Sequence, residues 1–436
     1  MRRELAIALR ARATWLVAAL GALLVGHGFV LATDLYSASS RSALSSLLQT
    51  REMDPLAGVV RPTLGGVDFV LSLLGPVLAA RTLSIEKERR TYGALCLAVG
   101  SSWRVIIQKT FASALAMATL LAAPLLLFGL FRGFGGHVDP IETAVALTGV
   151  LLHLTLVTAM AVAAAAWTRT FAQAVTLGIL ASVTSWAIDA ADGFAALAWL
   201  GGASAWSIEQ RLLPFQRGII ALGSVCWLVL GTVIALGIAI VGGSFARTRQ
   251  KLLASAIILG VFVPTLGAIG TIRRGFDWSE ERRASLPPGA VLALRAIPEP
   301  IAIDVFLDRD DSRRRQVESD ALAKLVLARP DLTIRTPLDE NSNVAEAGRS
   351  SQYGRLVVHV GSAVRETRST SRRELTTLIL EAAGRPLPDW RQLTYPGFPF
   401  VIDGARRRWL GWFAYICVPL GLAVLGFTLT RRRAIR

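Results

Sequence analysis

Apolar segments of membrane-spanning length recur along the chain and restrict what it can fold into. Of its 436 residues, 53% are hydrophobic and the mean hydropathy is +0.50, which is not the composition of an ordinary soluble protein. A helix needs about 20 apolar residues to cross a bilayer, and by that length we predict about eight spans. The chain is therefore expected to be a polytopic α-helical membrane protein. The predicted spans are Ala13–Ala32, Thr63–Ala80, Thr110–Leu130, Val145–Trp167, Ala172–Ile188, Gly218–Val241, Leu252–Ile272 and Trp409–Leu429.

Positive charge is distributed unevenly between the loops that join these spans. The formal net charge is +16, which by itself would suit a nucleic-acid-binding protein. Lysine and arginine gather instead before the first span, in the loops after the second and sixth spans, and at the end of the chain. Cytoplasmic loops of membrane proteins carry such an excess. We therefore expect the lipid bilayer as partner, no nucleic acid, and both termini in the cytoplasm.

Residues 273–408 differ in composition from the rest of the chain. Their apolar runs are short and charges of both signs appear throughout, as in a globular domain. Seven spans precede this region, so it is expected outside the cytoplasm, and the last span returns the chain inward. Strands are predicted at Ile301–Leu307, Leu332–Thr336 and Leu356–Val360. One helix repeats Val317, Ala321 and Leu325, and another, Ser371–Ala383, has Glu374 placed for a capping box, so a small α/β domain is predicted.

Few residues of the spans or of the outer region have the pattern of a reactive site. Asp68 and His153 are possible intramembrane polar sites, because ionisable side chains in a membrane are costly and commonly functional. We favour the interpretation that Asp68 reaches water near the outer end of its span and that His153 makes a helix–helix hydrogen bond. No phosphate-binding loop, metal-ligand spacing or catalytic grouping occurs in the sequence. We predict no catalytic residue, no metal and no cofactor in this chain.

A dense run of charges lies between the second and third spans. Glu86, Lys87, Glu88, Arg89 and Arg90 follow the second span directly, and a short stretch, Thr91 to Val99, separates them from the third. A helix with these charges cannot lie in hydrocarbon, where each buried charge costs several kcal/mol. We expect it to protrude into the cytoplasm. An ordinary positively charged cytoplasmic loop is the alternative.

This segment resembles the coupling helix of ABC-2 type exporter permeases, whose loops read E-K-E-R-x-T-x-x-x-L. The residues that fill the pattern are Glu86, Lys87, Glu88, Arg89, Thr91 and Leu95. The resemblance implies that these residues, with Arg90, contact a separate ABC ATPase subunit and that ATP is bound by that subunit. It also implies a homodimer or heterodimer of permeases in a bacterial inner membrane.

Residues 273–383 are similar to the auxiliary domain of gliding-motility-type ABC exporters. The similarity rests on the order of an opening Phe276-Asp277-Trp278-Ser279, a strand of the type IDVFL and a helix that ends in ARPDLTIRT. The chain lacks the G-H-G-E signature and the second globular half of larger members of that family. The two resemblances together imply an ABC-2 permease core at residues 1–245, a connecting helix at 246–272, an extracytoplasmic auxiliary domain at 273–408 and an anchoring span at 409–436.

These resemblances imply a permease subunit of an ATP-driven exporter. One alternative is the membrane anchor of a non-transporting envelope or motility-type complex built on an ABC ATPase. The other is a membrane enzyme that acts on lipid or sugar, which the lack of a convergent His, Asp or Glu cluster in the sequence disfavours. No motif indicates the transported substrate.

Overall fold

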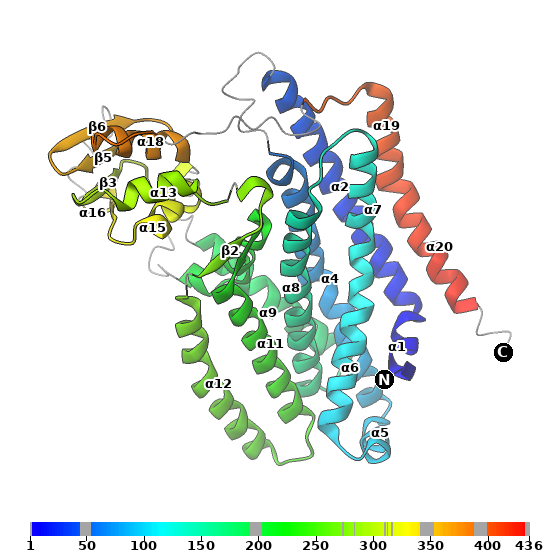
Figure 1. The fold of residues 1–436 in the computed structure, drawn as a ribbon. Helices are drawn as coiled ribbons and strands as arrows, with labels where there is room; N and C mark the ends of the chain where they lie inside the picture. Colours follow the sequence, from blue (N-terminus) through cyan, green and yellow to red (C-terminus); the bar gives the residue numbers. More distant parts are fainter. Residues whose placement is uncertain are drawn as a thin grey trace. The chain divides into compact units, whose positions relative to one another are not determined.

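The computed structural model describes residues 2–43, 54–191, 203–272, 274–282, 284–308, 311, 313–314, 317–340, 353–387 and 399–431 of the chain. Contacts divide the chain into two compact units, whose elements are labelled in Figure 1. The first unit comprises Met1–Ile188, Ala205–Trp278 and Leu393–Arg436. The second comprises Asp189–Ser204 and Ser279–Gln392.

Eight helices among the described residues are long and apolar enough to cross a membrane. They are Arg12–Ser42, Leu56–Glu88, Ser102–Gly133, Pro140–Trp167, Phe171–Ala190, Leu222–Gly243, Thr248–Gly270 and Gly404–Thr430. Each overlaps one predicted span, so the prediction of a polytopic helical membrane protein is confirmed. The helices extend beyond the apolar segments because helical hydrogen bonding continues into the flanking polar residues. The first of these helices runs on to Ala43, has 32 residues and is therefore about 48 Å long.

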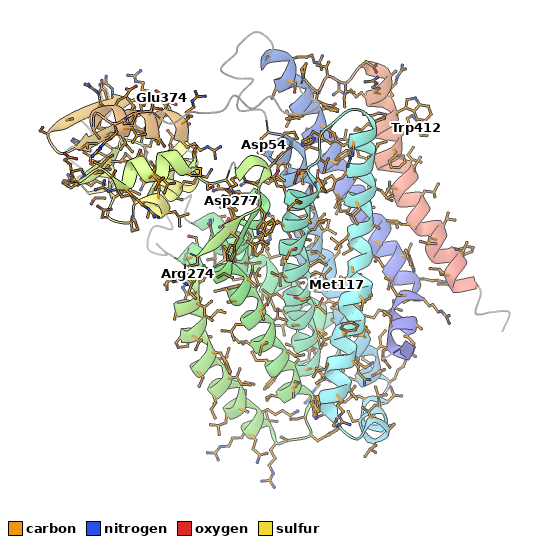
Figure 2. The ribbon with its side chains drawn as sticks, in the orientation of Figure 1. Asp54, Met117, Arg274, Asp277, Glu374 and Trp412 are labelled. Atoms are coloured by element: carbon orange, nitrogen blue, oxygen red, sulfur yellow. The ribbon has the colours of Figure 1, made fainter. Side chains whose placement is uncertain are left out.

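The first unit consists almost entirely of helices. In chain order these are α1 (Arg2–Leu9), α2 (Arg12–Ala43), η1 (Leu56–Val60), α4 (Arg61–Glu88), α5 (Tyr92–Val99), α6 (Ser102–Met117), η2 (Ala118–Leu121), α7 (Ala122–Gly133), α8 (Pro140–Trp167), α9 (Phe171–Ala191), α11 (Leu222–Gly243), α12 (Thr248–Gly270), α19 (Gly404–Trp412), η8 (Phe413–Cys417) and α20 (Val418–Arg431). Trp412 of α19 is exposed and points away from the other helices (Figure 2), as suits a residue at a membrane–water interface.

The third span is interrupted close to a proline. Pro124 has no amide hydrogen to donate to the carbonyl of Leu120, and the 3₁₀ segment η2 separates α6 from α7 there. Pro76 and Pro264 lie inside α4 and α12, which remain continuous helices. Pro124 thus lies directly after a 3₁₀ break between two helices, whereas Pro76 and Pro264 do not interrupt theirs.

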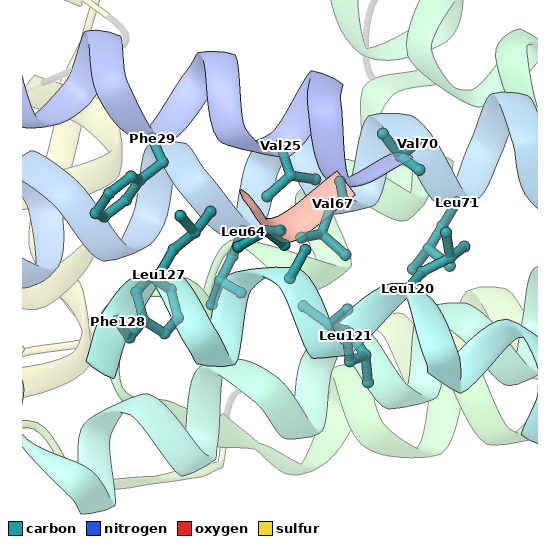
Figure 3. Close-up of a cluster of buried hydrophobic side chains, with 14 of the residues drawn as sticks. Val25, Phe29, Leu64, Val67, Val70, Leu71, Leu120, Leu121, Leu127 and Phe128 are labelled. Atoms are coloured by element: carbon teal, nitrogen blue, oxygen red, sulfur yellow. The ribbon is translucent and has the colours of Figure 1, made fainter. Parts of the chain in front are cut away.

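The core of the first unit lies between α2, α4 and α7. Val25 and Phe29 from α2 contact Leu64 from α4 and Leu127 from α7 (Figure 3). Because lipid is as apolar as these side chains, close packing holds the helices together more than the hydrophobic effect does. Gly75 illustrates this, since a Cβ atom there would lie 2.5 Å from Met117 Cε.

Between α9 and α11 the chain forms a short polar layer instead of a longer helix. Its elements are η4 (Ala203–Trp206), α10 (Ile208–Leu212), η5 (Phe215–Arg217) and β1 (Ile219–Ala221). β1 pairs antiparallel with β2 (Gly275–Asp277), and the Trp278 amide donates to the Gly218 carbonyl over 2.9 Å. Two expectations change. The sixth span begins at Leu222 because the residues just before it form strand β1. Phe276-Asp277-Trp278 belongs to the first unit, so the long segment of the second unit starts at Ser279.

The described part of the second unit contains a four-stranded sheet with the order β4-β3-β5-β6. The strands are β3 (Ile301–Val305), β4 (Thr333–Arg335), β5 (Leu356–Val360) and β6 (Ala363–Thr367). β4 runs parallel to β3, whereas β5 and β6 are antiparallel to their neighbours. The three predicted strands are present. β6 was not predicted, because its polar, exposed sequence does not alternate as a half-buried strand does.

Helices supply the rest of the buried core of the second unit. They are α13 (Pro288–Arg295), η7 (Val317–Leu322), α15 (Ala323–Ala328) and α18 (Arg372–Ala382). Two short helical segments, η6 (Glu280–Arg282) and α16 (Pro337–Glu340), contribute no described residue to this core. The predicted repeat of Val317, Ala321 and Leu325 is fully buried, as expected of a core face. The predicted capping box of α18 is wrong, because the Glu374 carboxylate accepts a hydrogen bond from Thr367 at the end of β6 instead.

Candidate coupling site and a buried polar cluster

The segment between α4 and α6 differs from expectation in where the first helix ends. α4 continues through Glu88, so the first three charges of the run form its last turn. Arg90 then adopts a left-handed backbone conformation with φ 57°, and the Thr91 amide donates to the Glu86 carbonyl over 2.9 Å. This reversal starts α5, which Gly100 ends at φ 79°. The predicted short stretch is therefore helical, and the charges precede it.

A buried ion cluster connects this turn to α1 and α6. Lys109 of α6 is 1% exposed, and its ammonium nitrogen lies 2.7 Å from Glu86 Oε1 and 3.0 Å from Glu4 Oε2. Glu4 belongs to α1, so one cation joins three helices. Removing one member of such a cluster leaves a buried charge without compensation, which is costly. We call Glu4, Glu86 and Lys109 the Lys109 cluster.

Lys87 and Glu88 connect the same turn to α8 and α9. The Lys87 ammonium donates at 2.8, 2.8 and 2.5 Å to the carbonyl oxygens of Ala165, Ala166 and Thr168. The last carbonyls of a helix lack intrahelical partners, and the helix dipole favours a cation beside them. The Glu88 carboxylate accepts from the Phe171 amide at the start of α9 over 2.6 Å. Of the predicted ATPase contacts, Glu86, Lys87 and Glu88 thus have partners inside the chain.

The outward surface of this segment is formed by other residues. Arg89, Arg90 and Thr91 are exposed, and neither arginine side chain makes a hydrogen bond or ion pair with the described part of the chain. Leu97 of α5 is 85% exposed. Leu95, the last residue of the predicted contact set, is half-buried and packs against the helix ends. The outward surface of this segment therefore carries the apolar side chain of Leu97 and the cationic side chains of Arg89 and Arg90.

Tyr92, which sequence reasoning did not single out, connects α5 to the end of α11. Its hydroxyl donates to the Gly243 carbonyl over 2.8 Å, and its ring lies 6.1 Å from that of Phe245. Burial is the main reason that the pKa of Tyr92 is raised, so the phenol remains a hydrogen-bond donor. A side chain at Gly243 would collide with Ile106, so glycine permits this close approach. The partners are 151 positions apart, and no local pattern could indicate them.

The two residues named as possible intramembrane polar sites contact each other. His153 Nδ1 lies 2.9 Å from Asp68 Oδ1, which joins α8 to α4. The hydrogen bond expected of His153 is therefore present. The expectation that Asp68 reaches water is wrong, because packing against α8 and η5 leaves Asp68 only 4% exposed and His153 1% exposed.

Two further side chains complete this buried cluster. Gln216 Nε2 of η5 donates to Asp68 Oδ2 over 3.2 Å, and Ser72 Oγ of α4 lies 3.5 Å from His153 Nε2. Sequence reasoning missed Gln216, which is 148 positions from Asp68 and lies in a segment with no motif. We call Asp68, Ser72, His153 and Gln216 the Asp68 cluster. Over the described ranges, no group of three or more His, Cys, Asp or Glu side chains is arranged to hold a metal ion.

A scan against protein-family models, a search of curated proteins and a search of solved structures each find no match to this chain.

Proposed function

We propose that the chain is the membrane subunit of an ATP-driven exporter of the ABC-2 type, and that a separate ABC ATPase binds it at residues 89–99. The observation that carries the proposal is a contrast within this segment. Its base is tied to α1, α6, α8 and α9 by Glu86, Lys87 and Glu88. Its outer surface presents Arg89, Arg90 and Leu97. A rigid cationic projection with an apolar side chain suits docking into an acidic groove of a soluble subunit.

The ties at the base supply a route by which force on this segment reaches the spans. A displacement of residues 89–99 acts on α1 and α6 through the Lys109 cluster and on α8 through Lys87. Such contacts resist being broken one at a time, because each break leaves a buried charge unpaired. ATP-dependent movement of the ATPase would therefore shift several helix ends together.

The backbone of Arg90 also supports a binding role. Its φ of 57° lies where glycine is the usual residue, and another residue there costs roughly 1–2 kcal/mol. No hydrogen bond or ion pair of the Arg90 guanidinium with the described residues offsets this cost. Strained residues gather at functional sites. We infer that the Arg90 side chain is required for contact with another molecule.

This function sets the orientation of the chain in the membrane. Residues 89–99 face the cytoplasm, and ATP is bound by the partner subunit. Counting spans from there gives cytoplasmic termini and places residues 273–408 outside the inner membrane of a bacterium. The permease works as a homodimer or heterodimer, and its outer domain binds substrate or a protein of the envelope.

Arg90→Gly is expected to weaken ATPase binding about tenfold or more and to stabilise the chain itself by up to about 1 kcal/mol. Glycine relieves the left-handed backbone and removes only an exposed guanidinium. The tagged chain is purified from its native membrane, and the P-loop ATPase that co-purifies is identified by mass spectrometry. Its dissociation constant is then measured for wild-type and variant chains in nanodiscs, together with their melting temperatures.

Two further variants complete this test. Arg89→Ala is expected to weaken binding as well, whereas Arg132→Ala, which removes an exposed guanidinium at the end of α7, is expected to bind as wild type does. The proposed function fails if no P-loop ATPase co-purifies. It also fails if the combined Arg89→Ala and Arg90→Gly variant keeps wild-type affinity.

A further inference from the structure

The turn between α11 and α12, residues 244–247, lies beside α5. It directly follows Gly243, whose carbonyl accepts the hydrogen bond from Tyr92. Phe245 lies against the Tyr92 ring, and Lys251 holds the other side of the turn by donating to a carbonyl at the end of α11 over 2.8 Å. Figure 1 shows both segments at the same end of the helices. α5 and this turn therefore form one continuous surface.

Large apolar side chains are exposed on both segments. Leu97 of α5 is 85% exposed, and Phe245 of the turn is 73% exposed. Trp103 at the start of α6 is exposed as well, with the Arg104 guanidinium 5.3 Å from its ring centroid. Exposed apolar residues surrounded by charged ones mark a contact with another molecule.

The surroundings of these side chains are cationic. The exposed arginines are Arg89, Arg90, Arg104, Arg247 and Arg249. The nearby acidic groups are already engaged, since Glu86 pairs with Lys109 and Glu88 accepts from a backbone amide of α9. A surface that complements this one must supply carboxylates around an apolar pocket.

We propose that residues 244–249 are a second contact element for the same ATPase, and that Phe245 enters an apolar pocket rimmed by carboxylates, beside the groove that receives α5. The inference rests on the proposed function and adds to it a contact outside the charged run of residues 86–90. Aromatic side chains flanked by arginine are typical of the centres of protein interfaces.

A protein partner fits this surface better than the headgroups of anionic lipids. Headgroups would satisfy the arginines, but a fluid lipid surface does not require that Leu97 and Phe245 be held at a fixed separation. Tyr92 ties α5, which carries Leu97, to the turn that carries Phe245, through its hydrogen bond to Gly243 and its ring contact with Phe245. A shaped pocket requires such rigidity, because ordering mobile side chains on binding lowers affinity.

Phe245→Glu places a carboxylate opposite carboxylates and is expected to weaken ATPase binding at least about tenfold. Phe245→Leu keeps an apolar side chain and is expected to stay within about threefold of wild type. Ile141→Glu introduces the same charge at an exposed position at the start of α8, the end of that helix far from Lys87, and is expected to change nothing. The dissociation constant of the co-purifying P-loop ATPase is measured in nanodiscs of neutral lipid and of anionic lipid.

Weakened binding of Phe245→Glu in both lipid compositions supports the inference. Wild-type affinity of Phe245→Glu, with Arg90→Gly still weakened, overturns it and leaves the proposed function standing. A loss confined to anionic nanodiscs identifies the turn as a lipid contact and overturns it too. Wild-type affinity of both variants removes the proposed function as well. If Phe245→Glu lowers the melting temperature, Arg249→Glu replaces it with the same expected loss.

Discussion

Lys109→Met is expected to destabilise the membrane unit by about 3 kcal/mol. The substitution keeps an unbranched side chain of similar volume but leaves the carboxylates of Glu4 and Glu86 facing each other without a cation. The expected loss of stability lies at the lower end of the range for buried ion clusters, because the side chains of Glu4 and Glu86 are 16% and 25% exposed and reach some water. The measurement is the melting temperature of the chain in nanodiscs, with limited proteolysis to detect release of α1.

A triple variant separates lost charge balance from lost packing at this cluster. Adding Glu4→Gln and Glu86→Gln to Lys109→Met removes all three charges and is expected to recover most of the stability, because neutral replacements of buried ionic groups are commonly tolerated. A Lys109→Met protein as stable as wild type, or a triple variant no better than the single one, would contradict the account of this cluster.

His153→Leu is expected to cost about 3–5 kcal/mol, the largest effect of any single change considered. It leaves the Asp68 carboxylate buried with the Gln216 amide as its remaining hydrogen-bond donor among the residues of the Asp68 cluster. Asp68→Asn together with His153→Leu is expected to cost less than His153→Leu alone, because no buried charge is then left unpaired. The measurement is again the melting temperature in nanodiscs, for each single variant and for the double one.

A pair at the surface of the same unit serves as the matched control. Asp34 of α2 and Arg407 of α19 form an ion pair at 2.6 Å, in which the arginine side chain is 63% exposed. Asp34→Asn is expected to cost less than about 1 kcal/mol, as is usual for an exposed pair. Equal losses from Asp34→Asn and His153→Leu, or additive effects of Asp68→Asn and His153→Leu, would refute the pairing of the buried cluster.

The spans could be predicted because hydrocarbon thickness imposes both a length and an apolar composition on any helix that crosses it. The layer from Ile208 to Ala221 could not be predicted in this way. Its strand β1 exists because it pairs with β2, whose residues come two spans later, and the local sequence reads as the start of a helix. The same holds for β6, which is specified by its pairing with β5 more than by its own pattern.

The sequence indicated where the charged turn lies, but not which residues its side chains contact. The charged run located the turn between α4 and α5, because a dense set of charges cannot lie in hydrocarbon. Lys109 and Tyr92 were missed, since Lys109 is 105 positions from Glu4 and Tyr92 is 151 from Gly243. Asp68 was misjudged from its place near the end of a span. What covers it is η5, which no hydropathy pattern indicates.

A photocrosslink from position 97 shows whether residues 89–99 contact an ATPase in the cytoplasm. A photoreactive amino acid replaces Leu97 in one chain and Ile141 in another, and both are irradiated in native membranes. We expect a crosslink from position 97 to a P-loop ATPase and none from position 141. Crosslinks from position 97 to lipid alone, or equal yields of the ATPase from both positions, would contradict the proposed contact.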